Sequence, residues 1–139
     1  MKRMILLICF LIIPVYIFSQ VLFLYGGTDH KVFLGCLNSN KYDSDSIWNK
    51  HGTYGSKYSA DSIWNKYGTY GSKYNSLSPW NRYSSDPPVV VDKYGKFYGY
   101  FTSNKYLTNR TNIKWLLWIL DNYEIIVEDT ELAYEELFP

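Results

Sequence analysis

Side chains suited to binding a partner recur at a spacing of sixteen residues in the middle of the chain. Asn offers amide hydrogen bonds, Tyr offers a rigid amphipathic ring, and Lys or Arg tolerates an anionic polymer. If equivalent positions lie side by side, they form ladders that suit a repetitive extracellular partner, such as a glycan or an extended envelope protein. We therefore predict a ligand-binding surface of eight residues: Asn49, Asn65, Asn81, Lys50, Lys66, Arg82, Tyr58 and Tyr74.

Tryptophan recurs with the same spacing, as Trp48, Trp64 and Trp80. The indole rings either join the ladders or face inward as the core of a small domain, and we favour the inward interpretation. The Asn ladder and the Lys and Arg ladder are expected to be exposed.

Residues that could catalyse a reaction are few. His51 occupies the repeat position that holds Tyr67 and Tyr83 in the other copies, which indicates a packing or surface role. Cys36 as a nucleophile would need a nearby base, and His30 is the only candidate. The sequence has no nucleophile elbow, phosphate loop, zinc-ligand spacing or paired catalytic carboxylates. We predict a protein that is not an enzyme and needs no cofactor.

A calcium site is the remaining chemical alternative. The first copy has an Asp-x-Asp pair, Asp43 and Asp45, but the third copy has Asn75 and Leu77 at these positions. Oxygen ligands that are lost along the array do not define a site in every copy, and no glycine-centred twelve-residue loop is present. The sequence therefore predicts a structural turn and no metal.

These candidates belong to a sixteen-residue repeat that occupies residues 41–88. Lys41–Ser56 and Lys57–Ser72 agree at thirteen of sixteen positions, and Lys73–Pro88 is a looser third copy. Self-similarity at a fixed period indicates stacked units, each too small to bury its own apolar face.

Each copy has the pattern of one short helical turn, S-[I/P]-W-N-[K/R]. Ser46, Ser62 and Ser78 occupy the cap position, where Ser is favoured. Gly52 and Gly68 are expected to end the first two turns in a left-handed conformation.

Two β-hairpins are predicted to flank the repeats. The first joins Val21–Tyr25 to Lys31–Leu37 through a Gly-Gly turn, and Cys36 is expected to be a small buried residue within it. The second joins Val89–Val91 to Lys96–Thr102, and Gly99 suggests a bulge. We expect both hairpins to pair in one antiparallel sheet.

An apolar helix is predicted after the second hairpin, capped by Thr111 or Asn112 and ending at Asn122. Its buried stripe follows the i, i+3, i+4, i+7 spacing: Ile113, Leu116, Leu117 and Leu120. The predicted fold class is therefore α+β, with a small antiparallel sheet of two hairpins bracketing three sixteen-residue, turn-rich repeats, plus one C-terminal apolar helix.

The end of the chain is acidic. Residues 21–120 carry twelve Lys and Arg against six Asp and Glu, whereas residues 121–139 carry seven acids and no Lys or Arg. A short strand, Ile125–Val127, and a weak helix, Glu131–Phe138, are expected there. The segment is either solvated, folded back electrostatically on the cationic body, or a mask over an anion-binding surface.

The start of the chain resembles an export element. Lys2 and Arg3 precede the apolar run Met4–Ile17, and Ser19 offers a cleavage position for a signal peptidase. A retained membrane anchor is the alternative, because apolarity resumes after Gln20. The body is exported in either case, to the secreted fraction or the cell envelope.

The repeat resembles those of small exported bacterial proteins with tandem YGSxYSxxSIWN units. The matching residues are Tyr54–Asn65 and, more loosely, Tyr70–Asn81, with Leu34–Leu37 and Pro87–Val90 flanking them. The resemblance covers the middle half of the chain and implies export and the repeat, but no activity.

The predicted organisation is a signal peptide or membrane anchor at 1–20, a single domain at 21–123 and an acidic tail at 124–139. The predicted function is a non-catalytic, exported binding or surface-interaction module. The alternative is a purely structural or membrane-tethered envelope protein without a small-molecule ligand. The net charge of +1 gives no reason to expect nucleic acid as a partner, and a membrane is expected only if the N-terminal segment is not cleaved.

Overall fold

A four-stranded antiparallel sheet forms one layer of the domain. The computed structural model describes residues 20–139, so the expected signal peptide or anchor lies outside the described residues except for Gln20. The strands are β1 (Phe23–Gly26), β2 (Val32–Cys36), β3 (Val89–Val91) and β4 (Phe97–Tyr100), in the order β2-β1-β3-β4. The prediction of a small α+β domain with an antiparallel sheet is confirmed.

Glycine permits the irregular points of this sheet. The pairing of β3 with β4 shifts register between Val89 and Val91, opposite Gly99, which has a φ of 104°. A Cβ at Gly99 would lie 2.6 Å from the Cα of Thr111, so both the positive φ and the close approach exclude a side chain. The bulge expected at Gly99 is confirmed, and Gly35, with a φ of 114°, lies at a second register shift between β1 and β2.

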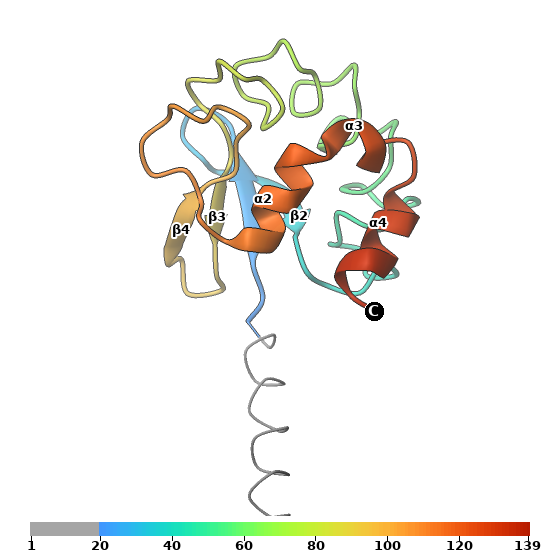
Figure 1. Ribbon diagram of the computed structural model, residues 1–139. Coiled ribbons are helices and arrows are strands. Elements are labelled where there is room, and N and C mark those ends of the chain that lie inside the picture. Colours follow the sequence, from blue (N-terminus) through green and yellow to red (C-terminus); the bar gives the residue numbers. More distant parts are fainter. Residues whose placement is uncertain (1–19) are drawn as a thin grey trace, which may run out of the picture.

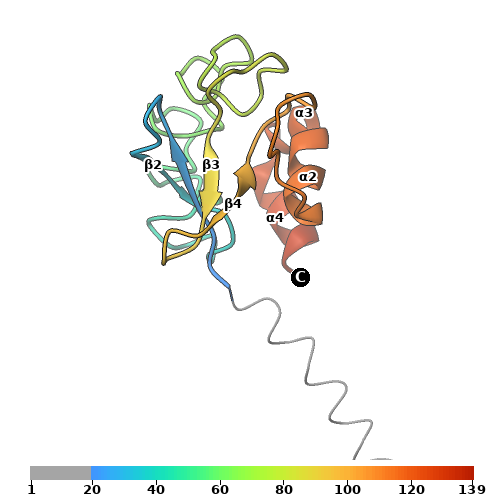
Figure 2. The same cartoon turned by 90° about the vertical axis from the view of Figure 1, so that its left-hand side faces the viewer.

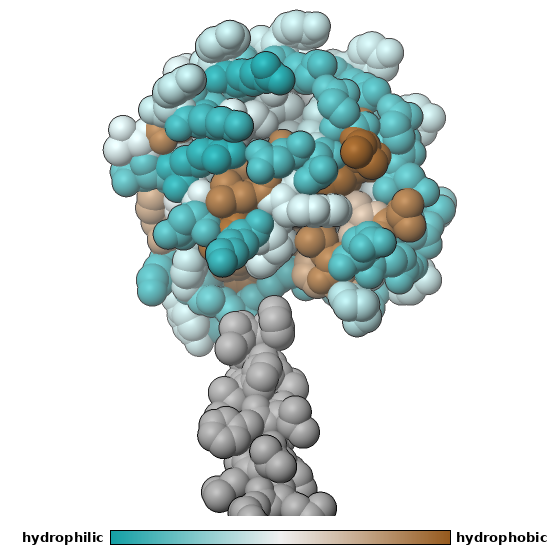
Figure 3. Space-filling view, in the orientation of Figure 1, coloured by the Kyte–Doolittle hydropathy of each residue, from teal (hydrophilic) through white to brown (hydrophobic). Residues whose placement is uncertain are grey.

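Three short helices form the second layer: α2 (Lys114–Asp121), α3 (Tyr123–Ile126) and α4 (Thr130–Leu137). Figure 2 shows them on the opposite side of the molecule from the sheet, and Figure 1 shows the coil between β2 and β3 curving around α3 and α4. Brown, hydrophobic patches on the face in Figure 3 gather over the helices, whereas the coil at the top is teal and pale.

The indole rings of Trp48, Trp64 and Trp80 form the core between the coil and the helices. All three are at most 3% exposed, and successive ring centroids are 5.5 Å apart. Trp48 also contacts Phe138, and Trp80 stacks on Tyr123 at 4.2 Å. The tryptophans face inward, as the sequence analysis favoured.

The predicted helical turns of the repeats are single turns and not helices. The Oγ atoms of Ser46, Ser62 and Ser78 each accept a hydrogen bond from the backbone N–H two residues later, at 3.0 to 3.1 Å. These serines are therefore the residues that were predicted to cap. The chain leaves the helical path after this one turn, because the side-chain oxygen of Asn49 or Asn65 accepts from the backbone N–H two residues later.

The glycines expected to end these turns are not left-handed. The positive-φ glycines among the described residues are at other positions, so the prediction for Gly52 and Gly68 is wrong. Gly55 and Gly71 are the ones the geometry requires, because a Cβ there would lie 2.1 Å and 1.9 Å from the carbonyl oxygens of Asn49 and Asn65.

The predicted start of the C-terminal helix is also wrong. Ile113 occupies the N-cap of α2 and no side chain caps it. The hydroxyl of Thr111 instead accepts a hydrogen bond from the N–H of Ile113 at 3.3 Å, and Thr111 lies two residues before the N-cap position. The chain buries Leu116, Ile119 and Leu120 on α2.

The acidic end of the chain is part of the folded body. Ile126, Val127 and Ala133 are buried in the core, so the solvated alternative does not describe residues 124–139. The strand expected at Ile125–Val127 is wrong, since Tyr123–Ile126 is helical. The helix expected at Glu131–Phe138 corresponds to α4, which Asp129 caps by accepting from the N–H of Leu132 at 3.1 Å.

Ion pairs join this acidic segment to the repeats. Lys41 lies 2.9 Å from Glu131 and 2.9 Å from Glu135, and Lys50 lies 3.2 Å from Glu131. The two lysines hold the pKa of Glu131 below its usual range, Lys41 more strongly than Lys50. In turn, hydrogen bonds to Glu135 and Glu131 raise the pKa of Lys41.

We expect the variant Glu131→Gln to flatten the pH dependence of stability in acid. A carboxyl whose pKa is lowered on folding adds stability above its unfolded pKa of about 4.3, and this stability is lost as the pH falls through the folded pKa. Urea unfolding at pH 7 and at pH 3 measures the loss, which should be smaller in the variant than in the unmodified chain. Glu136→Gln is the matched control, because Glu136 makes no ion pair among residues 20–139. Equal losses in all three proteins would contradict the role of this pair.

Candidate functional site: an array of tyrosine–cation turns

A polar–cation–aromatic tripeptide recurs eight times between residues 40 and 106. Its first residue is Asn, Ser or Asp, its second is Lys or Arg, and its third is Tyr, except for one His. The first residues of the eight tripeptides are Asn40, Asn49, Ser56, Asn65, Ser72, Asn81, Asp92 and Asn104. Six lie within or at the edge of the sixteen-residue repeats, but those at Asp92 and Asn104 lie outside them.

All eight tripeptides make the same local hydrogen bond. The side-chain oxygen of the first residue accepts from the backbone N–H of the third residue, at 2.8 to 3.2 Å. Such Asx and Ser turns need only a short polar side chain, which is why Asn, Ser and Asp are interchangeable at this position. We call these eight elements the tyrosine–cation turns.

The aromatic ring of each turn points into solvent. The seven tyrosines of the turns are 79% to 97% exposed: Tyr42, Tyr58, Tyr67, Tyr74, Tyr83, Tyr94 and Tyr106. Every other tyrosine among residues 20–139 is buried or half-buried. Tyrosine is usually at least partly buried in a folded protein, so the seven solvent-facing rings form a set distinct from the packed ones.

Two equivalent hollows lie between the turns and the helices. Tyr58 and Tyr67 flank the first, which has a volume of 300 Å³. Tyr74 and Tyr83, sixteen residues further on, flank the second, of 560 Å³. The corresponding tryptophan lines each hollow, together with Glu128 in the first and with Asp121 and Glu124 in the second.

The acidic residues pair with most of the cations in the repeats. Lys66 lies 3.3 Å from Glu128, and Lys73 lies 3.0 Å from Glu124, whose hydrogen bond raises the pKa of Lys73. With Lys41 and Lys50, four repeat lysines are therefore bound to the acidic segment. Arg82 makes no ion pair with any described residue.

The structure places the predicted site residues in two groups. Tyr58 and Tyr74 are exposed, as are Lys50, Lys66 and Arg82. The three asparagines are half-buried, and the Oδ1 of each accepts the hydrogen bond of its own turn. The Nδ2 of Asn65 also donates to the carbonyl of Ser59 at 3.0 Å, and that of Asn49 donates to the carbonyl of Asp43 at 3.1 Å. These asparagines shape the turns that present the tyrosines.

The turn at the end of the array, at Asn104, was not predicted from the sequence. Lys105 and Tyr106 continue the series of exposed cations and rings there. The signal was present as a three-residue motif, which a search for the sixteen-residue period does not detect.

The remaining reactive side chains, His30 and Cys36, bond other partners than each other. His30 hydrogen-bonds the carbonyl of Pro87 at 3.1 Å, and the buried thiol of Cys36 has the side chain of Asn38 as its partner. His51 is exposed. Within residues 20–139 no group of His, Cys, Asp and Glu could hold a metal ion, and no helix is long and apolar enough to cross a membrane.

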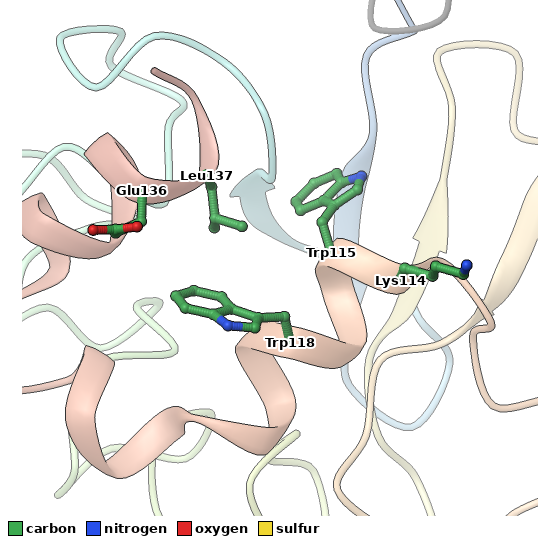
Figure 4. Close-up of a pocket in the computed structure, with 5 residues that line it drawn as sticks. All are labelled: Lys114, Trp115, Trp118, Glu136 and Leu137. Atoms are coloured by element: carbon green, nitrogen blue, oxygen red, sulfur yellow. The ribbon is translucent and has the colours of Figure 1, made fainter.

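An apolar hollow of 370 Å³ lies between α2 and α4. In Figure 4 the rings of Trp115 and Trp118 reach toward Leu137, whereas the charged ends of Lys114 and Glu136 point away from it. No polar groups converge there, so this hollow lacks the chemistry of an active site.

Fold and surface together define a small α+β domain that presents repeated tyrosine–cation turns. No model of a protein family matches the chain, and no curated protein or solved structure matches it either.

Proposed function

We propose that this chain is a non-catalytic, exported binding module whose tyrosine–cation turns hold an extended extracellular glycan. The observation that carries the proposal is the division of the tyrosines: all seven exposed tyrosine rings lie in the turns, and four of them flank two hollows in pairs. Tyrosine gives large, rigid contact area at a low cost in conformational entropy, and its hydroxyl can hydrogen-bond a hydroxylated ligand.

The three sixteen-residue segments are, on this proposal, equivalent units that stack side by side. Its support is a repeated contact: the indole N–H of Trp64 donates to Ile47 and that of Trp80 donates to Ile63, both at 2.6 Å. In both cases the acceptor is the residue seventeen positions earlier, in the preceding copy. Units with a constant offset repeat their surface as well, which favours a ligand that itself repeats.

The polar lining of the hollows favours a glycan over a protein partner. Stable protein interfaces have a core of apolar anchors depleted in charge, whereas these hollows combine tyrosine rings with lysines, an arginine and carboxylates. An envelope protein is the second kind of partner that the test below can reveal.

A structural role without a ligand is the alternative function. One observation favours it, namely that Lys41, Lys50, Lys66 and Lys73 already pair with glutamates of the same chain. On this alternative the cations stabilise the fold and the exposed rings have no partner. The export of the chain rests on residues 1–20 in either case.

We expect the double variant Tyr74→Ser, Tyr83→Ser to bind glycan about tenfold more weakly or worse, because aromatic contact residues commonly contribute more than about 1 kcal/mol each. The melting temperature should stay nearly unchanged, since both rings are more than 85% exposed and their turn hydrogen bonds use only backbone N–H groups. A glycan array probed with the purified full-length chain identifies the ligand, and calorimetry measures its affinity.

Tyr94→Ser is the matched control, because Tyr94 has the same turn and similar exposure but lines neither hollow. Glycan binding that is equal in the double variant and the unmodified chain would contradict the proposal. If the chain binds an envelope protein but no glycan, the partner of this surface would be a protein. No binding to either would favour the structural alternative.

A further inference from the structure

A third hollow, of 450 Å³, continues the array beyond the repeats. It shares Arg82 and Tyr83 with the second hollow and adds Lys105, Tyr106 and Arg110. The charges that line it are three cations and one carboxylate, that of Asp121. The first hollow has two lysines and one glutamate, and the second has two cations and two acids, so the third has the largest positive excess.

The cations of this third hollow make no ion pair with any acid among residues 20–139. The repeat lysines differ, because the glutamates of the C-terminal segment neutralise four of them. The positive charge of the array is therefore concentrated where Arg82, Lys105 and Arg110 meet.

The chain holds this hollow in place through backbone bonds. The N–H of Ser103 donates to the carbonyl of Pro79 at 2.7 Å, and the amide of Asn104 donates to the carbonyl of Ser84 at 2.9 Å. The Nε of Arg110 donates to the carbonyl of Thr102 at 2.8 Å. A binding group that is fixed before the ligand arrives loses little entropy on binding.

One donor of Arg110 is left without an acceptor. Its Nη2 atom is buried and has no hydrogen-bond partner among the described residues. A buried polar atom without a partner is uncommon in folded proteins and destabilises the site by the cost of its desolvation. The guanidinium of Arg110 therefore has a donor that no described residue uses, and Arg110 lines the hollow beside two other cations.

We propose that Arg82, Lys105 and Arg110 form a binding site for one oxyanion, a carboxylate or sulfate group, carried by an acidic glycan. The inference rests on the proposed function and names the substrate class: the polymer is acidic, and its charged group is held at this end of the array. Guanidinium groups bind oxyanions through paired N–H donors, which gives direction as well as charge. Tyr83 and Tyr106 flank the hollow, where they contact the sugar ring that carries the acid.

Calorimetric titration of the full-length chain, purified in mild detergent, tests this inference. The probes are a galacturonic acid hexamer, its fully methyl-esterified form, a sulfated hexamer and inorganic sulfate. We expect an acidic hexamer to bind at least tenfold more tightly than the neutral ester. The carboxylate and sulfate arms show which oxyanion the site prefers, and inorganic sulfate alone shows how much of the affinity the anion provides without the sugar.

The double variant Arg82→Gln, Lys105→Gln should bind the acidic hexamer no more tightly than the methyl ester. Both side chains are exposed, so the variant should fold normally. The control Lys31→Gln, Lys93→Gln removes the same charge at exposed positions outside the third hollow and should keep the preference. Arg110→Lys retains the charge without the paired donors and should weaken the preference at least threefold.

Equal affinity of the unmodified chain for the acidic and neutral hexamers would overturn the inference and leave the proposed glycan-binding function intact. An equal loss in the control double variant would also overturn it, since the effect would then belong to net charge. Absence of binding to any hexamer would overturn the inference, and the glycan array would decide separately whether the chain binds another glycan.

Discussion

Replacing Trp64 by Ala is expected to lower the free energy of unfolding by about 3 to 5 kcal/mol, the range for removing a large buried aromatic side chain. The indole of Trp64 is fully buried and lies 5.5 Å from the rings of both Trp48 and Trp80. It also donates a hydrogen bond to the carbonyl of Ile47 at 2.6 Å, which the variant leaves without this partner. Urea unfolding followed by tryptophan fluorescence and circular dichroism measures the loss.

Two further variants separate core packing from general sensitivity to substitution. Tyr67→Ala removes a ring that is 97% exposed and should change the stability by less than about 0.5 kcal/mol. Trp64→Phe keeps an aromatic ring but no N–H donor, so its loss should lie between the other two. A similar loss in Trp64→Ala and Tyr67→Ala would show that the tryptophans are not the core.

The variant Gly71→Ala is expected to lower the free energy of unfolding by about 3 kcal/mol, at the upper end for an overpacked site. Its Cβ would lie 1.9 Å from the carbonyl oxygen, 2.4 Å from the carbonyl carbon and 2.8 Å from the nitrogen of Asn65. All three are backbone atoms of the preceding turn, so a rotamer change cannot relieve the overlap. Thermal and urea unfolding measure the effect.

Gly68→Ala is the control within the same copy of the repeat. The nearest atom to its Cβ would be the side-chain Nδ2 of Asn65 at 3.1 Å, and Gly68 has no positive φ. Its effect should stay within about 1 kcal/mol in either direction. Gly55→Ala, whose Cβ would lie 2.1 Å from the oxygen of Asn49, should match Gly71→Ala if the copies are equivalent. Equal effects of Gly68→Ala and Gly71→Ala would contradict the close approach.

The sequence predicted those parts of the fold that depend on short-range patterns. Two β-prone runs beside a Gly-Gly turn indicated strands, and Gly99 indicated its bulge before any pairing was known. The inward tryptophans followed from their size, because a small domain has few other side chains to fill its core.

Helix boundaries and glycine roles were harder to predict, because they depend on contacts between segments. Thr111 has the right chemistry for an N-cap, but it lies two residues before the N-cap position, and its hydroxyl bonds the N–H of Ile113. Gly52 and Gly55 are equally permissive in sequence terms, and only the approach of Asn49 shows which one must lack a side chain. The strand expected at Ile125–Val127 is overridden by helical packing against the tryptophan core.

The binding surface was predicted in part. The exposure of Tyr58 and Tyr74 was predicted because these residues repeat. The amide of Asn65 was predicted to bind a ligand, but it forms hydrogen bonds within its own repeat. Sequence alone does not show whether an amide bonds its own backbone or a partner. The pairing of Lys73 with Glu124 likewise required the fold, since fifty-one residues separate them.

Nuclear magnetic resonance of the full-length chain with labelled tyrosine rings, titrated with a galacturonic acid hexamer, examines the proposed surface most directly. We predict that the ring signals of Tyr74, Tyr83 and Tyr106 shift with one common affinity, while the signal of Tyr94 stays in place. Shifts confined to other rings, or equal small shifts of all seven exposed tyrosines, would show that the turns do not form a glycan-binding array.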